Sequence, residues 1–286
     1  MSLLGRFFGV VRDDPDARDH RFLLTHPEAA EVALPMAVDL HKRLPPARHQ
    51  ESIGSCTAQA SAGLMAYLYP GFDPSPLALY YDTRVREGTA DRDAGSQIRN
   101  AMKVLQKTGA IGEDDWPYDT SRFAEPPPVD ATPRFTIAAY SRLASETEML
   151  SCLALRQPFV LAIQLPDYFE GDVARTGVMP LPSGKPDMIG AHAMLCVGYD
   201  LEFHSNPDFI ASGLEPSSVE STALLVRNSW GPFFGRDGHA WLPMSWATNP
   251  STGGDAWTGH KLFTTANEPQ GPTVAGVRIE GRFQPR

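Results

Sequence analysis

The 286-residue chain has few cysteines and no long apolar run. Its three cysteines, Cys56, Cys152 and Cys196, cannot all pair with one another, and their spacing forms neither a CxxC pair nor a zinc knuckle. No segment approaches the roughly 20 apolar residues that a membrane-spanning helix needs. The sequence therefore disfavours a disulfide-stapled protein, a cysteine-zinc protein and a membrane span.

A basic run that could follow a phosphate backbone is also missing. The chain carries 25 Lys and Arg against 34 Asp and Glu, which gives a net charge of −9. Nucleic acid is thus not expected as a partner. The start, MSLLGRFFGVVRDD, has one Arg inside a broken apolar stretch and no small-residue cleavage pattern, so it is a poor secretory signal. We expect a cytoplasmic protein, or one exported by a route that uses no signal peptide.

The composition favours a loop-rich α+β protein, because 42% of residues are hydrophobic while 24 Gly and 26 Pro indicate many turns. The Pro126–Pro128 run interrupts a helical pattern, and shorter apolar runs bounded by Gly and Pro follow it. We therefore divide the chain there. The expected parts are an N-terminal arm or short pro-segment (1–36), a mainly helical lobe (37–128), a mainly β lobe (129–248) and a C-terminal tail of uncertain order (249–286).

Local patterns predict several elements. A small-residue helix starts at Ser55, close to its N-cap, and ends before Pro70, and a second helix covers the segment SQIRNAMKVLQKTG. A third helix is expected at 146–155, whereas 200–222 has little periodicity and is expected to be a loop. Strands are predicted at 136–140, 159–164, 192–199, 223–227 and 239–243.

Cys56 lies at the start of the first predicted helix. Unpaired backbone N–H groups and the helix dipole favour a negative charge there, so the thiol is expected to ionise more readily than usual. Taken alone, a cysteine at this position is as compatible with a small buried hydrophobic residue as with a nucleophile.

Two polar residues supply the partners that a nucleophilic thiol needs. His192 opens the apolar run HAMLCVGYD, and Asn228 follows the apolar run ALLVR, so each lies at the end of a predicted strand. A thiolate, an imidazole that moves the proton and an amide that orients the ring together form a nucleophilic site. Singly, His192 also fits a satisfied core histidine and Asn228 a turn residue.

In order and spacing, these motifs resemble the papain family of cysteine peptidases over most of residues 38–246. Gln50 stands six residues before Cys56 in QESIGSC, His192 begins a His-Ala block that ends in Gly-Tyr, and Asn228 begins Asn-Ser-Trp-Gly. The resemblance implies a two-lobed α+β fold, with a helical lobe, an antiparallel β-barrel-like lobe and the active site in the cleft between them. It also implies that Gln50 donates a hydrogen bond to the oxyanion.

The same resemblance implies substrate-binding positions. Gly95, in Asp-Ala-Gly-Ser, would pair with an extended peptide, and Gly95 and Ala162 would border the pocket for the second residue before the cut. Trp230 would cover the His192 and Asn228 pair and touch the leaving-group side of a substrate. Thr57, Ile53 and Ala191 depart from common family residues, and the familiar long inhibitory pro-region has no counterpart in residues 1–36.

The function predicted from the sequence is hydrolysis of peptide bonds through a thioester acyl-enzyme, with a peptide or protein as substrate. Two alternatives stay open: a transamidase, ligase or cyclase that uses the same Cys-His-Asn site, and an inactive peptide-binding module. The chemistry requires no metal and no organic cofactor. The sequence leaves the oligomeric state undecided.

Overall fold

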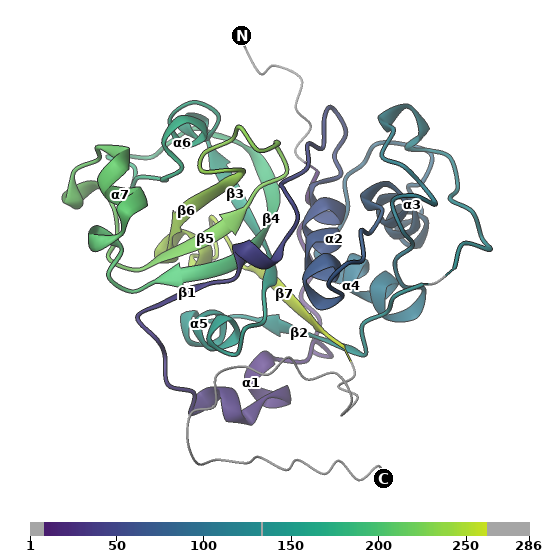
Figure 1. The fold of residues 1–286 in the computed structure, drawn as a ribbon, viewed down its shortest axis with the longest axis horizontal. Coiled ribbons are helices and arrows are strands. Elements are labelled where there is room, and N and C mark those ends of the chain that lie inside the picture. The colour runs from purple at the N-terminus through teal and green to yellow at the C-terminus, as the bar shows by residue number, and fades with distance from the viewer. Residues whose placement is uncertain (1–8, 133, 262–286) are drawn as a thin grey trace.

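The computed structural model describes residues 9–132 and 134–261, and within them two lobes lie side by side (Figure 1). Three helices form the first lobe, and an antiparallel sheet forms most of the second. The first-lobe helices are α2 (Cys56–Leu68), α3 (Pro76–Glu87) and α4 (Ile98–Lys107). Because α2 contacts α3 and α4 on one side and the sheet on the other, its N-terminus lies at the junction of the lobes.

Helix α2 is buried almost throughout because its residues are small and apolar. A β-carbon on Gly63 would lie 3.1 Å from Leu195 Cδ2, so this glycine lets the helix approach the sheet closely. The predicted helix is confirmed, and Ser55 occupies its N-cap position. The Ser55 hydroxyl does not cap the helix, since it hydrogen bonds to the Tyr118 hydroxyl at 2.7 Å.

All strand pairings in the sheet are antiparallel, in the order β2-β7-β3-β4-β5-β6, and β1 pairs with β4. The long strands β3 and β4 are buried over most of their length, which fits their continuous apolar sequences. The strands are β1 (Ala37–Asp39), β2 (Ala139–Leu143), β3 (Phe159–Pro166), β4 (Met188–Asp200), β5 (Ala223–Arg227), β6 (His239–Pro243) and β7 (Asp255–His260).

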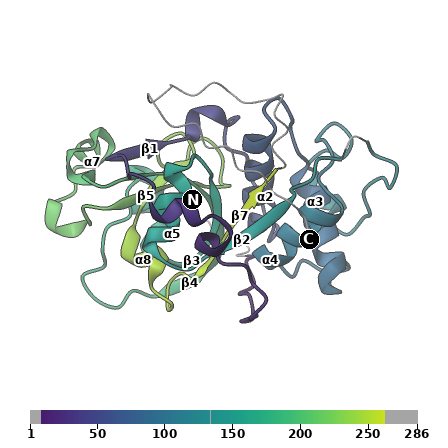
Figure 2. The ribbon, with the colours of Figure 1, turned by 90° about the horizontal axis from the view of Figure 1, so that it is seen from below.

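Short helices surround this framework. They are α1 (Phe22–Thr25), α5 (Glu146–Ala154), α6 (Asp172–Thr176), α7 (Pro207–Ser212) and α8 (Met244–Thr248), with 3-10 turns at Pro27–Ala30, His41–Arg43, Thr120–Arg122, Asp167–Phe169, Phe203–Ser205 and Pro216–Ser218. In Figure 1, α1 and α5 lie below the sheet lobe. In Figure 2, which is seen from below, α5 lies on the side of the sheet lobe and α4 on the side of the helical lobe.

Most predicted elements are confirmed. Strands β5 and β6 have the predicted bounds, α4 and α5 agree closely, and β3 and β4 extend beyond them. Strand β2 begins at Ala139 rather than Thr136. The residues before it pair with the helical lobe instead, because Phe135 and Ala110 exchange backbone hydrogen bonds.

Three expectations were wrong. Helix α3 was not predicted, since Pro76 and Tyr-rich, charged residues obscure its pattern. The segment 200–222, expected to be a loop, contains α7, which Pro207 starts and Gly213 ends. Residues 255–260, expected in a tail of uncertain order, form the buried strand β7 between β2 and β3. The rest of the predicted tail, 262–286, lies outside the described residues.

The N-terminal arm crosses both lobes. Val10 forms a parallel bridge with Ser96 of the helical lobe, and Arg21 forms one with Arg142 of strand β2. Between them, Trp257 Nε1 donates a 2.7 Å hydrogen bond to Asp13. The described part of the arm is therefore packed against the molecule rather than extended into solvent.

Among the described residues, no helix has the length and apolar character needed to cross a membrane.

Candidate active site

His192 and Asn228 meet on neighbouring strands of the sheet. His192 lies on β4 and Asn228 follows β5, and His192 Nε2 is 2.8 Å from Asn228 Oδ1. The Ser229 backbone N–H donates to the same oxygen at 2.7 Å, which fixes the orientation of the amide. Because an amide oxygen only accepts, His192 must carry its proton on Nε2. The Asn228 amide thus fixes the orientation of the imidazole ring.

Cys56 lies at the first residue of α2, against the strand that carries His192. The backbone of Ala193, the residue after His192, hydrogen bonds to the Cys56 thiol. The lobes therefore bring the thiol next to β4 at the position of the histidine.

The thiol is fully buried, and this burial raises its pKa above the usual value. Hydrogen bonds from the backbone of Ala193, Gly9 and Thr57 and from the Thr57 side chain oppose that shift. Burial at this position therefore opposes the lower pKa that the helix start alone predicts. Residues that cover the sulfur remove the water that would solvate a thiolate.

Gln50 is held between the two lobes. Its backbone N–H donates to the Ser229 carbonyl at 2.8 Å, and its side-chain Oε1 accepts from Ser229 Oγ at 2.6 Å. Its Nε2 donates to the Ile53 carbonyl at 3.0 Å, inside the loop that leads to Cys56. The side-chain amide is therefore oriented with its NH₂ group toward the nucleophile loop.

Two residues that support this loop were not given a role from the sequence. The Tyr118 hydroxyl bonds to the Gln50 carbonyl at 2.8 Å and to Ser55 Oγ. Both carboxylate oxygens of Asp93 accept from the Gly54 backbone N–H, at 2.9 and 3.1 Å. The sequence could have pointed to Asp93, since this residue opens the Asp-Ala-Gly-Ser block. Tyr118 follows Pro117 and stands in no comparable motif.

The predicted substrate-binding residues lie around the candidate active site. Ala162 lines a small pocket together with Val10, Arg12 and Asp255. Gly95 has a positive φ of 70°, and its N–H donates to the Tyr80 hydroxyl at 3.1 Å. The Trp230 ring lies 5.0 Å, centroid to centroid, from the His192 ring, so it covers one side of the imidazole.

The arm passes directly over the sulfur. The Gly9 carbonyl accepts from the Ser96 N–H at 2.7 Å, and the Val11 N–H donates to the Ser96 carbonyl at 3.1 Å. A β-carbon on Gly9 would lie 1.8 Å from the Gly54 carbonyl oxygen, and one on Gly95 would lie 2.1 Å from the Gly9 carbonyl oxygen. Only glycine therefore fits at position 9, between Gly54 and Gly95.

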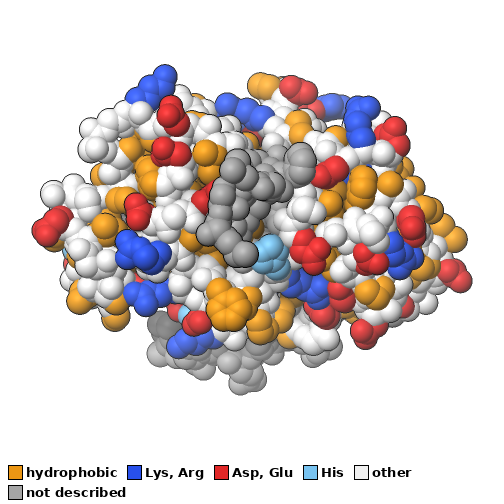
Figure 3. Space-filling view, turned by 90° about the horizontal axis from the view of Figure 1, so that it is seen from above, with side chains coloured by type: hydrophobic (Ala, Val, Ile, Leu, Met, Phe, Trp, Pro, Cys, Tyr) orange, Lys and Arg blue, Asp and Glu red, His pale blue; other side chains and the backbone are white. Residues whose placement is uncertain are grey.

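The described residues contain no group of three or more His, Cys, Asp or Glu side chains that could hold a metal ion. Acidic and basic side chains are interspersed over both lobes on the face shown in Figure 3.

The comparisons with known proteins agree with one another. Residues 34–251 match the model of the papain family cysteine proteases. An uncharacterised peptidase C1-like protein of Acanthamoeba polyphaga mimivirus is 27% identical over 289 residues, covering 90% of this chain and 87% of the relative.

Solved structures give the same result. Xylellain, a cysteine protease from Xylella fastidiosa, superposes with a TM-score of 0.76 at 30% identity, covering 91% of this chain and 97% of xylellain. A procathepsin B from Trypanosoma congolense shares the fold, with a TM-score of 0.63 at 16% identity, 82% of this chain and 80% of that one. With a helical lobe, an antiparallel sheet lobe and a family match over most of its length, this chain belongs to the papain family of cysteine proteases, and it is a cysteine peptidase with the two-lobed papain-like α+β fold.

Proposed function

We propose that this peptidase cleaves peptide bonds through a thioester on Cys56, with His192 moving the proton, Asn228 orienting the ring and Gln50 binding the oxyanion. The observation that carries the proposal is the 2.8 Å contact between His192 Nε2 and Asn228 Oδ1. That contact directs the other ring nitrogen away from Asn228, on a strand whose next residue hydrogen bonds to the Cys56 thiol.

The reaction follows from these positions. The Cys56 sulfur attacks the carbonyl carbon of the peptide while His192 Nδ1 holds the thiol proton, and the C–N bond breaks as that proton passes to the leaving amine. Water then attacks the thioester, giving up a proton to His192, and the C–S bond breaks to release a carboxylic acid and the thiol. Gln50 Nε2, which donates to the Ile53 carbonyl in the loop that leads to Cys56, is the proposed oxyanion donor.

The substrate is a peptide that lies along Ser96 with a small apolar side chain near Ala162. Val10 of the arm lines that pocket together with Ala162, which supports a role for the pocket in binding an apolar side chain. Trp230 packs edge-on against Phe169, at a centroid distance of 5.7 Å, so its ring offers a fixed wall for the residues after the cut.

The arm is proposed to hold the enzyme latent. Gly9 contacts the thiol with its backbone, while its carbonyl accepts from the Ser96 N–H and is therefore committed to the helical lobe. Residues 9–11 therefore cover the site, and this role supports treating 1–36 as a separate segment.

A test uses a Cys56→Ala variant and a peptide with a fluorescent amine leaving group. Hydrolysis is expected to vanish with the fold intact, whereas Cys196→Ala, which removes another buried thiol, keeps turnover. Activity retained by Cys56→Ala contradicts the proposal. Assays with an added amine acceptor distinguish hydrolysis from transamidation, because an amide product in place of the acid identifies the second reaction. Failure of a peptide electrophile to label Cys56 in a Gly9→Ala variant, whose arm no longer fits over the thiol, identifies an inactive binding module.

A further inference from the structure

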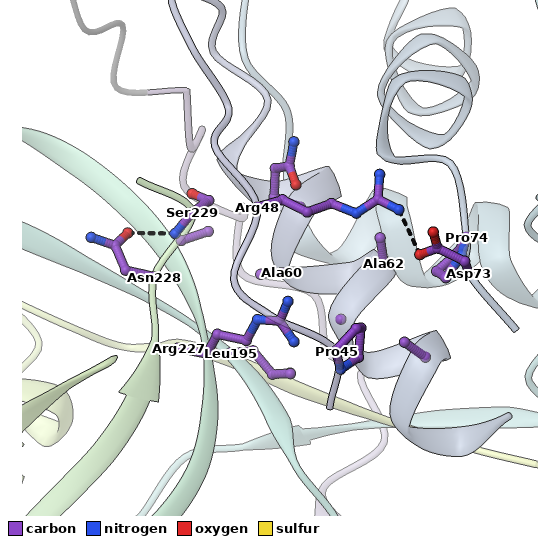
Figure 4. Close-up of a pocket in the computed structure, with 14 residues that line it drawn as sticks. Pro45, Arg48, Ala60, Ala62, Asp73, Pro74, Leu195, Arg227, Asn228 and Ser229 are labelled. Atoms are coloured by element: carbon purple, nitrogen blue, oxygen red, sulfur yellow. Dashed lines mark hydrogen bonds and ion pairs between the residues drawn. The ribbon is translucent and has the colours of Figure 1, made fainter. Parts of the chain in front are cut away.

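A small, partly open cavity lies between the lobes, beside His192 and Asn228. Its volume is about 20 Å³, enough for one water molecule or one monatomic ion. Helix α2 contributes Gln59 and Gly63, strand β4 contributes Ala193 and Leu195, and strand β5 contributes Arg227 at its end (Figure 4). Both lobes therefore form its walls.

Arg227 is the unusual residue in this cavity. The side chain extends from β5 toward α2 and Pro45, and the residue is only 8% exposed. Its Nη2 donates to the Pro46 carbonyl at 2.7 Å, but within residues 9–132 and 134–261 its Nη1 has no hydrogen-bond acceptor and no carboxylate forms an ion pair with the guanidinium. A buried arginine with an open donor and no counter-charge is costly.

Another arginine of this protein shows how the donors of a buried guanidinium can all find acceptors. Arg84 is fully buried, and its Nη1 donates to the carbonyls of Ala90 and Arg92 at 2.9 and 2.7 Å, while its Nη2 donates to the Phe123 carbonyl. Its guanidinium also lies 4.0 Å above the Tyr80 ring. Backbone carbonyls and aromatic faces thus occupy both amino groups of Arg84, whereas Arg227 Nη1 faces the cavity wall without them.

The nearby carboxylates are already engaged elsewhere. Arg48 Nη2 lies 2.5 Å from Asp73, and Arg48 Nη1 lies 2.7 Å from Glu113. Figure 4 shows the Arg48 guanidinium directed at Asp73 and away from Arg227. Burial, followed by the charge of Arg48, lowers the pKa of Arg227 to about 10, and the charge of Asp73, which also lines the cavity, opposes this shift only in part.

A second donor lines the cavity. Gln59 is 7% exposed, its side chain lies beside the Tyr118 hydroxyl, and among the described residues its Nε2 makes no well-formed hydrogen bond. A water molecule would accept from both donors but would leave the charge of Arg227 uncompensated. A small anion accepts from both and also neutralises that charge.

We propose that this cavity binds a monatomic anion of the size of chloride, held by Arg227 from the sheet lobe and Gln59 from the helical lobe. The anion joins the two lobes next to Asn228 and Ala193 and balances a charge that the fold buries. Its binding stabilises the closed arrangement of the lobes, and it is independent of whether the peptidase mechanism above is correct.

Thermal unfolding of the full chain tests this, in a Cys56→Ala background that removes self-digestion. At equal ionic strength, 200 mM sodium chloride is expected to raise the Tm by about 3–6 °C relative to sodium gluconate, whose anion is too large to enter. Arg227→Gln is expected to abolish this difference, while the exposed-site control Arg175→Gln keeps it. Gln59→Glu places a carboxylate in the cavity and is expected to abolish the chloride effect on the Tm as well. This second variant tests the proposal if Arg227→Gln does not fold.

Bromide-soaked crystals provide the direct test. The expected result is an anomalous peak within hydrogen-bond reach of Arg227 Nη1. A water molecule only, with no bromide peak, overturns the proposal. A chloride effect of equal size in wild type and Gln59→Glu overturns it too, because the stabilising ion would then bind elsewhere.

Discussion

Substituting Gly9 by alanine is the sharpest way to separate the arm from the catalytic machinery. The added β-carbon would lie 1.8 Å from the Gly54 carbonyl oxygen, and real β-carbons stay at least 3.0 Å from such atoms. The arm must therefore retreat by more than an ångström. Gly54 itself cannot move far, because its N–H is held by Asp93 at 2.9 Å.

The retreat breaks the two backbone hydrogen bonds between the arm and Ser96, which measure 2.7 and 3.1 Å. Each is worth about 1 kcal/mol. A loss of about 2 kcal/mol raises the population of enzyme with an uncovered thiol by about 30-fold. Water that reaches the sulfur also removes the burial that raises the pKa of Cys56, so the thiol ionises more readily.

The assay measures the second-order rate constant for alkylation of Cys56 by iodoacetamide, together with the initial rate on a fluorogenic peptide. Gly9→Ala is expected to raise both rates by about the same factor, because both report the uncovered fraction. Gly184→Ala is the matched control, since a β-carbon there meets no atom within 4 Å. Equal alkylation rates in Gly9→Ala and wild type would refute the reasoning that the arm shields the thiol.

Three further predictions concern the site and its cover. His192→Ala is expected to reduce kcat more than Asn228→Ala, since moving a proton contributes more than orienting the ring, and equal losses in steady-state kinetics contradict this ranking. Tyr118→Phe removes the hydroxyl that bonds to the Gln50 carbonyl and is expected to destabilise the protein by about 1–2 kcal/mol in urea unfolding, so an unchanged midpoint argues against this support. Burial, and then the charge of Asp255, raises the pKa of Asp13 to about 6. The docked arm is thus most stable below about pH 4 and loses up to about 3 kcal/mol as the pH rises through 6, so protease nicking of the arm should increase over that range in wild type and stay constant in Asp13→Asn.

The sequence alone singled out the proposed catalytic residues, because residue type limits the chemistry. A cysteine at a helix start, a histidine at the start of an apolar strand and an asparagine at the end of another have few joint explanations, and the fold brings His192 and Asn228 to 2.8 Å. The strands β5 and β6 were also predictable, since each is a short apolar run with clear ends.

Other elements could not be predicted because their stability comes from partners far away in the chain. The segment DAWTGH has no strong strand pattern of its own, yet it forms β7 because β2 and β3 offer open edges on both sides. The same holds for β1, which is only three residues long and pairs with β4 about 160 positions later. Such strands form only when the sheet already exists.

The sequence by itself determined which groups are the candidates for the chemistry: a thiol, an imidazole and two amides, in an order that indicates the family. Only the tertiary structure decided that Gly9 lies over the thiol and that Arg227 is buried with one amino group lacking a hydrogen-bond acceptor among the described residues. Both outcomes depend on contacts between distant segments, such as Gly9 with Gly54 and Gly95, or Asp13 with Asp255. Local residue patterns carry no information on such contacts, because the fold creates them when the lobes close.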